Sequence, residues 1–68
     1  MPKLEVLARE LETFTDRKDL ARVIEHIRND AYPIDGIVRE LIALKMKYFA
    51  QKLKSGYYEL NKETQNDK

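Results

Sequence analysis

Apolar residues occupy two sides of the segment from Ile37 to Leu60 rather than one. If this segment is a helix that turns by about 100° per residue, one apolar set falls in a single narrow sector. That set is Ile37, Leu41, Leu44 and Tyr48. The second set, centred roughly 130° away, is Val38, Ile42, Met46, Phe49, Leu53, Tyr57 and Leu60. The combined arc of roughly 200° is about twice the width of a one-sided surface helix. One apolar face is therefore surplus to what so short a chain can bury.

The spacing of apolar residues predicts three helices, at about 3–13, 16–30 and 36–60. The first helix carries Leu4, Leu7, Ala8, Leu11 and Phe14 on one side. The second carries Leu20, Val23, Ile24, Ile27 and Ala31, and Thr13 or Thr15 can cap it. Turn-forming residues separate it from the third helix between Asn29 and Gly36, where Asp35 is the expected N-cap. The third helix is expected to continue through Ser55 and Gly56 to about residue 60.

Composition favours one small all-α domain. The chain has 68 residues, of which 43% are hydrophobic and 37% charged, with only two Gly and two Pro. We expect a single helical domain over residues 1–60 and a disordered polar tail over 61–68. Because a chain below roughly 70–80 residues seldom gains more than about 3–5 kcal/mol from its core, and cysteine is absent, oligomerisation is the expected stabiliser. The prediction is a homodimer that packs its long helices antiparallel into a helical bundle, and the alternative is a monomeric three-helix bundle.

No motif indicates catalysis. His26 is the only histidine and there is no cysteine, whereas a zinc site needs three or four protein ligands. Glu25 and Asp30 are its sequence neighbours, but the carboxylates of the chain fall at helix caps or on polar faces. We therefore expect no enzymatic activity, no catalytic residue, no metal, no cofactor and no small-molecule substrate, with His26 on a helix surface.

The preferred function is that of a dimeric regulator or adaptor that binds another macromolecule, most simply a protein, through apolar stripes of the third helix. The expected interface is one of the two apolar sets: either Ile37, Leu41, Leu44 and Tyr48, or Val38, Ile42, Met46, Phe49 and Leu53. No apolar run reaches the roughly 18 residues that a membrane span needs, and no signal sequence begins the chain, so the expected location is cytoplasmic, without membrane association.

The alternative function is nucleic-acid binding by a composite basic face of the dimer. Net charge is only +1, but residues 1–35 hold six basic and eight acidic side chains while residues 36–68 hold seven basic and four acidic ones. The candidate phosphate contacts are Arg39, Lys45, Lys47, Lys52 and Lys54. The apolar positions of Tyr48 and Phe49 favour packing over base stacking.

A short stretch, Arg22-Val23-Ile24-Glu25, together with the long helix after Asp35, resembles the Hha family of nucleoid-associated modulators. Members of that family are small helical proteins that act by binding a DNA-binding partner. The resemblance implies a helical, non-enzymatic regulator. This chain lacks the tryptophan-bearing C-terminal stretch of the family, so no residue role is carried over.

Overall fold

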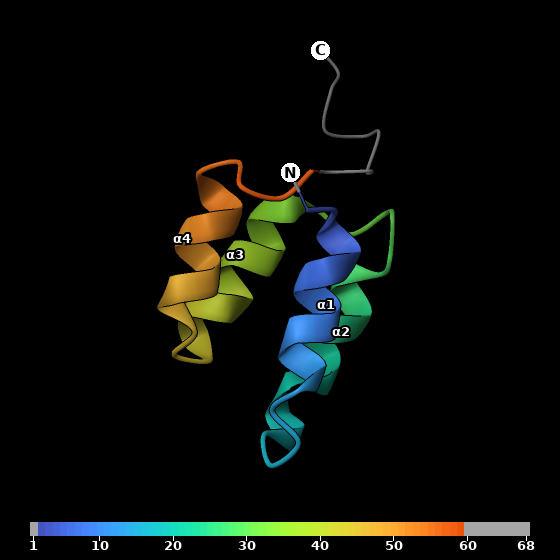
Figure 1. Ribbon diagram of the computed structural model, residues 1–68, viewed down its shortest axis with the longest axis vertical. Coiled ribbons are helices and arrows are strands. Elements are labelled where there is room, and N and C mark those ends of the chain that lie inside the picture. Colours follow the sequence, from blue (N-terminus) through green and yellow to red (C-terminus); the bar gives the residue numbers. More distant parts are fainter. Residues whose placement is uncertain (1, 60–68) are drawn as a thin grey trace.

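The computed structural model describes residues 2–59, which fold into two helical hairpins (Figure 1). The elements are α1 (Leu4–Glu12), the 3-10 turn η1 (Lys18–Leu20), α2 (Ala21–Ile27), α3 (Ile34–Ala43) and α4 (Lys47–Lys54). Successive α-helices run in opposite directions, so α1 pairs with α2 and α3 pairs with α4. The predicted all-α class and the first predicted helix are confirmed. The polar tail predicted for 61–68 lies outside the described residues.

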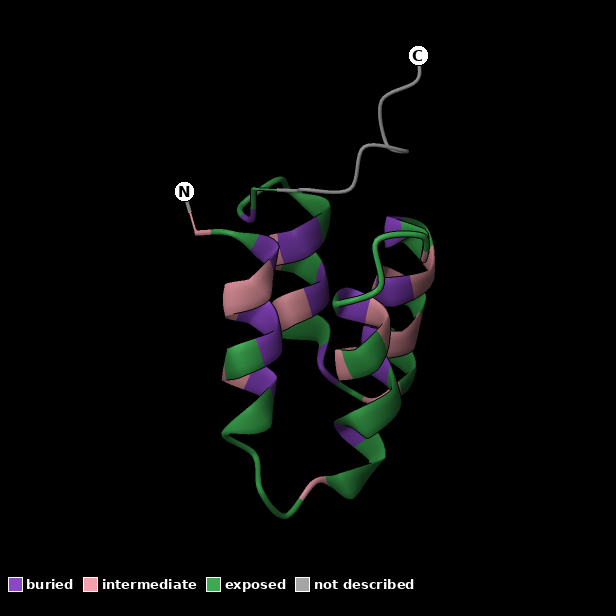
Figure 2. Cartoon of the chain, turned by 90° about the vertical axis from the view of Figure 1, so that its right-hand side faces the viewer, coloured by how far each residue is buried: buried purple, intermediate pink, exposed green. Residues whose placement is uncertain are grey.

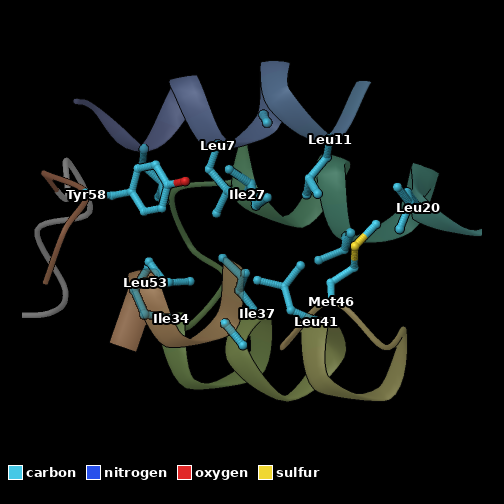
Figure 3. Close-up of a cluster of buried hydrophobic side chains, with 14 residues drawn as sticks. Leu7, Leu11, Leu20, Ile27, Ile34, Ile37, Leu41, Met46, Leu53 and Tyr58 are labelled. Carbon is cyan, nitrogen blue, oxygen red and sulfur yellow. The ribbon is translucent and has the colours of Figure 1, made fainter. Parts of the chain in front are cut away.

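The core lies between the two hairpins, and each helix contributes one apolar stripe to it (Figure 3). In α1 the stripe is Leu4, Leu7, Ala8 and Leu11, and in η1 and α2 it is Leu20, Val23 and Ile27. The α3–α4 hairpin contributes Ile34, Ile37, Leu41, Met46, Ala50 and Leu53. Apart from the adjacent pair Leu7 and Ala8, these positions recur within each helix at steps of three or four residues, the spacing that keeps one side of a helix facing its neighbour.

The single helix predicted for 36–60 is wrong, because the chain breaks it after Ala43. Lys45 adopts the left-handed conformation, with φ of 68°. The N–H of Met46 donates to the carbonyl of Leu41 at 2.8 Å, and the N–H of Lys45 donates to that of Ile42 at 3.0 Å. This pair of bonds is the Schellman termination, which more often has glycine at the left-handed position.

The break explains how the chain handles its wide apolar arc. In one continuous helix, Ile37 and Leu41 would face roughly 150° away from Met46 and Leu53. The turn at Lys45 reorients the second segment, so that all four side chains point into the same core. Two one-sided helices therefore replace one two-sided helix, and most of the predicted surplus is buried within the chain.

The helix α4 ends at Lys54, which corrects the expectation that it continues past Gly56. Gly56 has φ of 89°, and the N–H of Tyr57 donates to the carbonyl of Lys52 at 3.0 Å, a second Schellman termination. The chain then crosses to the N-terminus, where Glu59 exchanges backbone hydrogen bonds with Pro2 and Leu4.

This crossing buries Tyr58, which is 1% exposed, at one end of the core between α1 and Leu53 (Figure 3). Met46 and Leu20 lie at the opposite end. The Tyr58 hydroxyl donates to Oε1 of Glu10 at 2.9 Å. Burial, followed by this hydrogen bond, raises the pKa of Tyr58 well above that of a free phenol.

The second predicted helix, 16–30, begins later and ends earlier than expected. Residues 13–17 form a loop that is almost wholly exposed (Figure 2), and the Thr13 hydroxyl bonds back to the carbonyl of Glu10 rather than capping α2. Arg17 is drawn out of helical geometry, with φ of −105° and ψ of 77°. Its guanidinium pairs with Asp19 and also donates to the carbonyl of Leu44 at 3.0 Å, which joins this loop to the end of α3.

The third helix begins at Ile34, with Pro33 in the N-cap position, so Asp35 lies in the first turn and is not the cap. A proline here fits because Pro33 supplies the extended backbone of a cap, with φ of −71° and ψ of 144°. The negative charge of Asp35 near the helix N-terminus interacts favourably with the helix dipole.

The α1–α2 hairpin is closed on its outer side by Arg28, which pairs with Glu5 and Glu12, each at 2.7 Å. Hydrogen bonds from Arg28 hold the pKa of both carboxyl groups below their usual value, and the two carboxylates in turn raise the pKa of Arg28. All three groups lie at the surface, so the ion pairs are screened by solvent.

Candidate functional site

The structure divides the predicted interface residues between the core and the surface. Ile37, Leu41, Met46 and Leu53 are buried within the chain, so a partner cannot reach them without unfolding it. Val38, Leu44 and Phe49 are half-buried against the core. Ile42 and Tyr48 remain open, with exposed fractions of 47% and 68%.

The exposed apolar residues lie on two different flanks of the α3–α4 hairpin. Ile42 and Val38 lie on α3 beside a groove whose other wall is α4. Tyr48 and Phe49 are on α4 but do not line the groove. Phe49 lies about 100° around the helix from Ala50, on the side of Phe14, and Tyr48 points away from the core, about 60° beyond Gln51.

The groove between α3 and α4 consists of two adjoining hollows of about 220 Å³ and 480 Å³ that share Val38, Ile42 and Lys54. The smaller hollow is also lined by Lys47, Ala50 and Gln51. The larger one is also lined by Ile34, Asp35, Arg39, Leu53 and Gly56. The floor is apolar and the edges are charged, which is the composition of a surface that holds an amphipathic segment.

Three of the five predicted basic residues lie along this groove: Arg39, Lys47 and Lys54. Within residues 2–59, no carboxylate lies within ion-pair distance of any of them, whereas Arg9, Arg17 and Arg28 each have such a partner. The groove therefore carries positive charge that the described part of the chain does not neutralise.

The other two predicted basic residues are placed elsewhere. Lys45 is in the turn between α3 and α4. The Lys52 ammonium lies among aromatic rings on the far flank of α4, 4.3 Å from the ring centroid of Tyr57 and 4.9 Å from that of Tyr48. Cation–π attraction at these distances holds the ammonium at this site. The single basic face expected from the sequence is thus divided in two.

Aromatic side chains of α4 contact an aromatic residue in the loop after α1. Phe14 meets Phe49 edge to face, with ring centroids 6.2 Å apart, and Phe49 meets Tyr48 in the same way at 5.4 Å. We call Phe14, Tyr48, Phe49 and Tyr57 the aromatic flank. The sequence places Phe49 and Tyr57 in one apolar sector and Phe14 on the apolar side of the first helix, but the contact of Phe14 with Phe49 depends on the loop conformation and was not predicted.

The histidine is in a cluster that the sequence did not reveal. His26 Nδ1 lies 2.8 Å from a carboxylate oxygen of Glu40, and its ring stacks on that of Tyr32, with centroids 3.8 Å apart. The Tyr32 hydroxyl donates to the same carboxylate at 2.8 Å, which raises the pKa of Tyr32. Gly36 leaves room for the ring, since a Cβ there would be 2.8 Å from Cε2 of Tyr32. The cluster ties α2 to α3, and its only sequence signal was Gly36 four residues after Tyr32.

Among residues 2–59, no group of three or more histidine, cysteine or acidic side chains is arranged to hold a metal ion. In the same residues, the helices are all too short and too polar to cross a bilayer. The chain matches no protein-family model, no curated protein and no solved structure. The resemblance between residues 22–25 and the Hha family therefore stays a prediction.

Proposed function

We propose that this chain is a non-enzymatic helical interaction module that binds another protein through the groove between α3 and α4. The observation that carries the proposal is the exposed Ile42, at 47%, on the apolar side of a groove outside an otherwise filled core. Apolar surface that the fold does not bury gains free energy when a partner removes it from water. The cations beside it give such a partner a preferred orientation.

Affinity capture with three versions of the full chain tests this function. The wild type and Tyr48→Glu are expected to capture the same protein from the native host, because Tyr48 is exposed and does not line the groove. Ile42→Glu places a charge against the groove and is expected to weaken capture at least tenfold. Both substituted side chains are exposed, so thermal unfolding of the two variants serves as the matched control. Equal capture by Ile42→Glu contradicts the proposal.

Self-association is the second part of the proposal, and we assign it to the aromatic flank rather than to the groove. A two-fold axis through the groove brings Arg39, Lys47 and Lys54 close to their own copies, which is unfavourable. Tyr48 is 68% exposed, and within the described residues the aromatic flank carries a single cation, Lys52, whose ammonium lies over the Tyr48 ring at 4.9 Å, so the repulsion between copies is smaller there. Sedimentation equilibrium is expected to show a dimer that Tyr48→Glu dissociates and Ile42→Glu does not. A stable monomer at high micromolar concentration contradicts the homodimer.

Nucleic-acid binding is the second candidate function, and the grouping of Arg39, Lys47 and Lys54 along one groove favours it. Against it stand the net charge of +1 and the separation of Lys52 from these three residues. Titration with duplex and single-stranded DNA separates the two functions. Real binding must weaken steeply as salt concentration rises, and an absence of binding at low salt rejects this function.

A further inference from the structure

We infer that the segment held by the groove is an amphipathic helix with acidic flanks, supplied by a different protein. This inference rests on the proposed function and adds the chemistry of the partner. Three properties of the groove support it. The length of the groove suits a short helix, its cations have no carboxylate partner within the described residues, and neither a second copy of this chain nor a nucleic-acid strand suits both its charge and its apolar floor.

The length of the groove suits a short stretch of helix. Along α3 its lining runs from Ile34 to Ile42, which is about 12 Å at 1.5 Å per residue, or about two helical turns. A helix of that length offers apolar side chains at positions i, i+3 or i+4, and i+7 to a groove. Val38 and Ile42 form the apolar surface that such side chains would contact, above the buried Ala50.

The charge of the groove lining predicts the charge of the residues beside the apolar stripe of the bound helix. Arg39, Lys47 and Lys54 are cationic, and Asp35 is the only acidic residue among those that line the two hollows. Because Arg39 is exposed on α3 while Lys47 and Lys54 are exposed on α4, cations stand on both walls. A bound helix with Glu or Asp on either side of its apolar stripe therefore meets complementary charge on both sides.

The same features disfavour two other occupants. A second copy of this chain would bring like charges together across a two-fold axis. A nucleic-acid strand would pair its phosphates with the cations but leave Val38 and Ile42 against a charged backbone, which gains nothing from apolar surface. An acidic amphipathic helix can pair its carboxylates with the cations and bury its apolar side chains against Val38 and Ile42.

Selection from a display library of random peptides of about 15 residues, long enough for a marginal helix, tests the inference with the full chain as bait. The enriched peptides are expected to repeat apolar residues at i, i+3 or i+4 and i+7, with an excess of Asp and Glu. We expect the Lys47→Glu/Lys54→Glu variant to bind them about tenfold more weakly, as rim ion pairs are individually modest. In its own selection, this variant should enrich basic peptides instead.

Two further variants locate the binding. Ile42→Glu is expected to abolish binding of the enriched peptides, and Tyr48→Glu to leave it unchanged. The inference is overturned by enriched peptides without an acidic excess, by unchanged preference in the double variant, or by no enrichment at all. If capture of the natural protein depends on Ile42 but not on Lys47 and Lys54, the interaction function stands and the acidic helix is rejected. If that capture is independent of Ile42, the proposed function itself is rejected.

Discussion

The hydroxyl of Tyr58 donates a hydrogen bond of 2.9 Å to Oε1 of Glu10, which lies 48 residues earlier in the chain. The contact ties the segment after α4 to the last turn of α1, and the backbone of Glu59 pairs with Pro2 and Leu4 at the start of that helix. A ring that is 1% exposed also fills the end of the core. Tyr58, which lies outside all of the helices, therefore covers one end of the core.

We predict that stability at high pH depends on Tyr58. Its pKa is raised in the folded chain, chiefly by burial, so the neutral form is favoured there. The resulting stabilisation is fully present below the ordinary tyrosine pKa of 10.0 and is lost as pH rises through the folded value. Urea unfolding between pH 7 and 11.5 is expected to show this loss.

The matched variants are Tyr58→Phe and Tyr57→Phe. The first is expected to lower the free energy of unfolding by about 1 kcal/mol at pH 7, through loss of the hydrogen bond to Glu10, and to flatten the alkaline decline. The second removes a hydroxyl from a ring that is half exposed and should change little. An alkaline decline as steep in Tyr58→Phe as in the wild type contradicts the assignment.

We predict that Lys45→Gly stabilises the chain by about 1 kcal/mol, because glycine adopts the left-handed conformation without the strain that a lysine incurs. Ala43→Gly, two residues earlier and inside α3, should destabilise by about the same amount. Thermal or urea unfolding of the two variants measures the difference. Destabilisation by both glycines would instead indicate one continuous helix through this region.

Gly36→Ala should destabilise the chain by about 1 kcal/mol, although alanine is the better helix former, because its methyl group displaces the Tyr32 ring. The displaced ring loses its stacking on His26 and its hydrogen bond to Glu40. In a Tyr32→Ala background the same substitution should stabilise by about 0.5–1 kcal/mol. A double-mutant cycle by urea unfolding measures this change of sign, and its absence shows that the ring is not held against α3.

Stability in acid is expected to depend on Arg28. The pKa values of Glu5 and Glu12 are lowered by their hydrogen bonds to it, so their contribution is present above about pH 4.5, the unperturbed value, and is lost as pH falls through the folded values. Arg28→Gln should reduce this acid-dependent loss, as followed by the urea midpoint from pH 7 to 2.5. Arg9→Gln is the control, because Arg9 lies 3.8 Å from Glu5 and is largely exposed. Equal effects of the two substitutions argue against a special role for Arg28.

The sequence indicated most of the residues that line the candidate groove, but it did not indicate that they meet to form one. Val38 and Ile42 belonged to one predicted apolar sector, and Arg39, Lys47 and Lys54 were among the predicted phosphate contacts. Their meeting required α3 and α4 to fold back on each other, which a continuous helix forbids. No glycine marks the turn at Lys45, so the pattern of residue types alone favoured continuity.

The sequence by itself determined that the chain is helical, where α1 lies and that the chain turns after Asn29, although the turn ends at Pro33 rather than at Gly36. These features were predictable because helical periodicity and turn-forming residues act locally. Only the tertiary structure decided where the last helix breaks, that Tyr58 enters the core, and that His26 meets Glu40. The left-handed backbone at Lys45 is unfavourable locally. It is accepted because it turns Met46 and Leu53 toward the apolar stripes of α1 and α2, and that gain comes from residues far away in the chain.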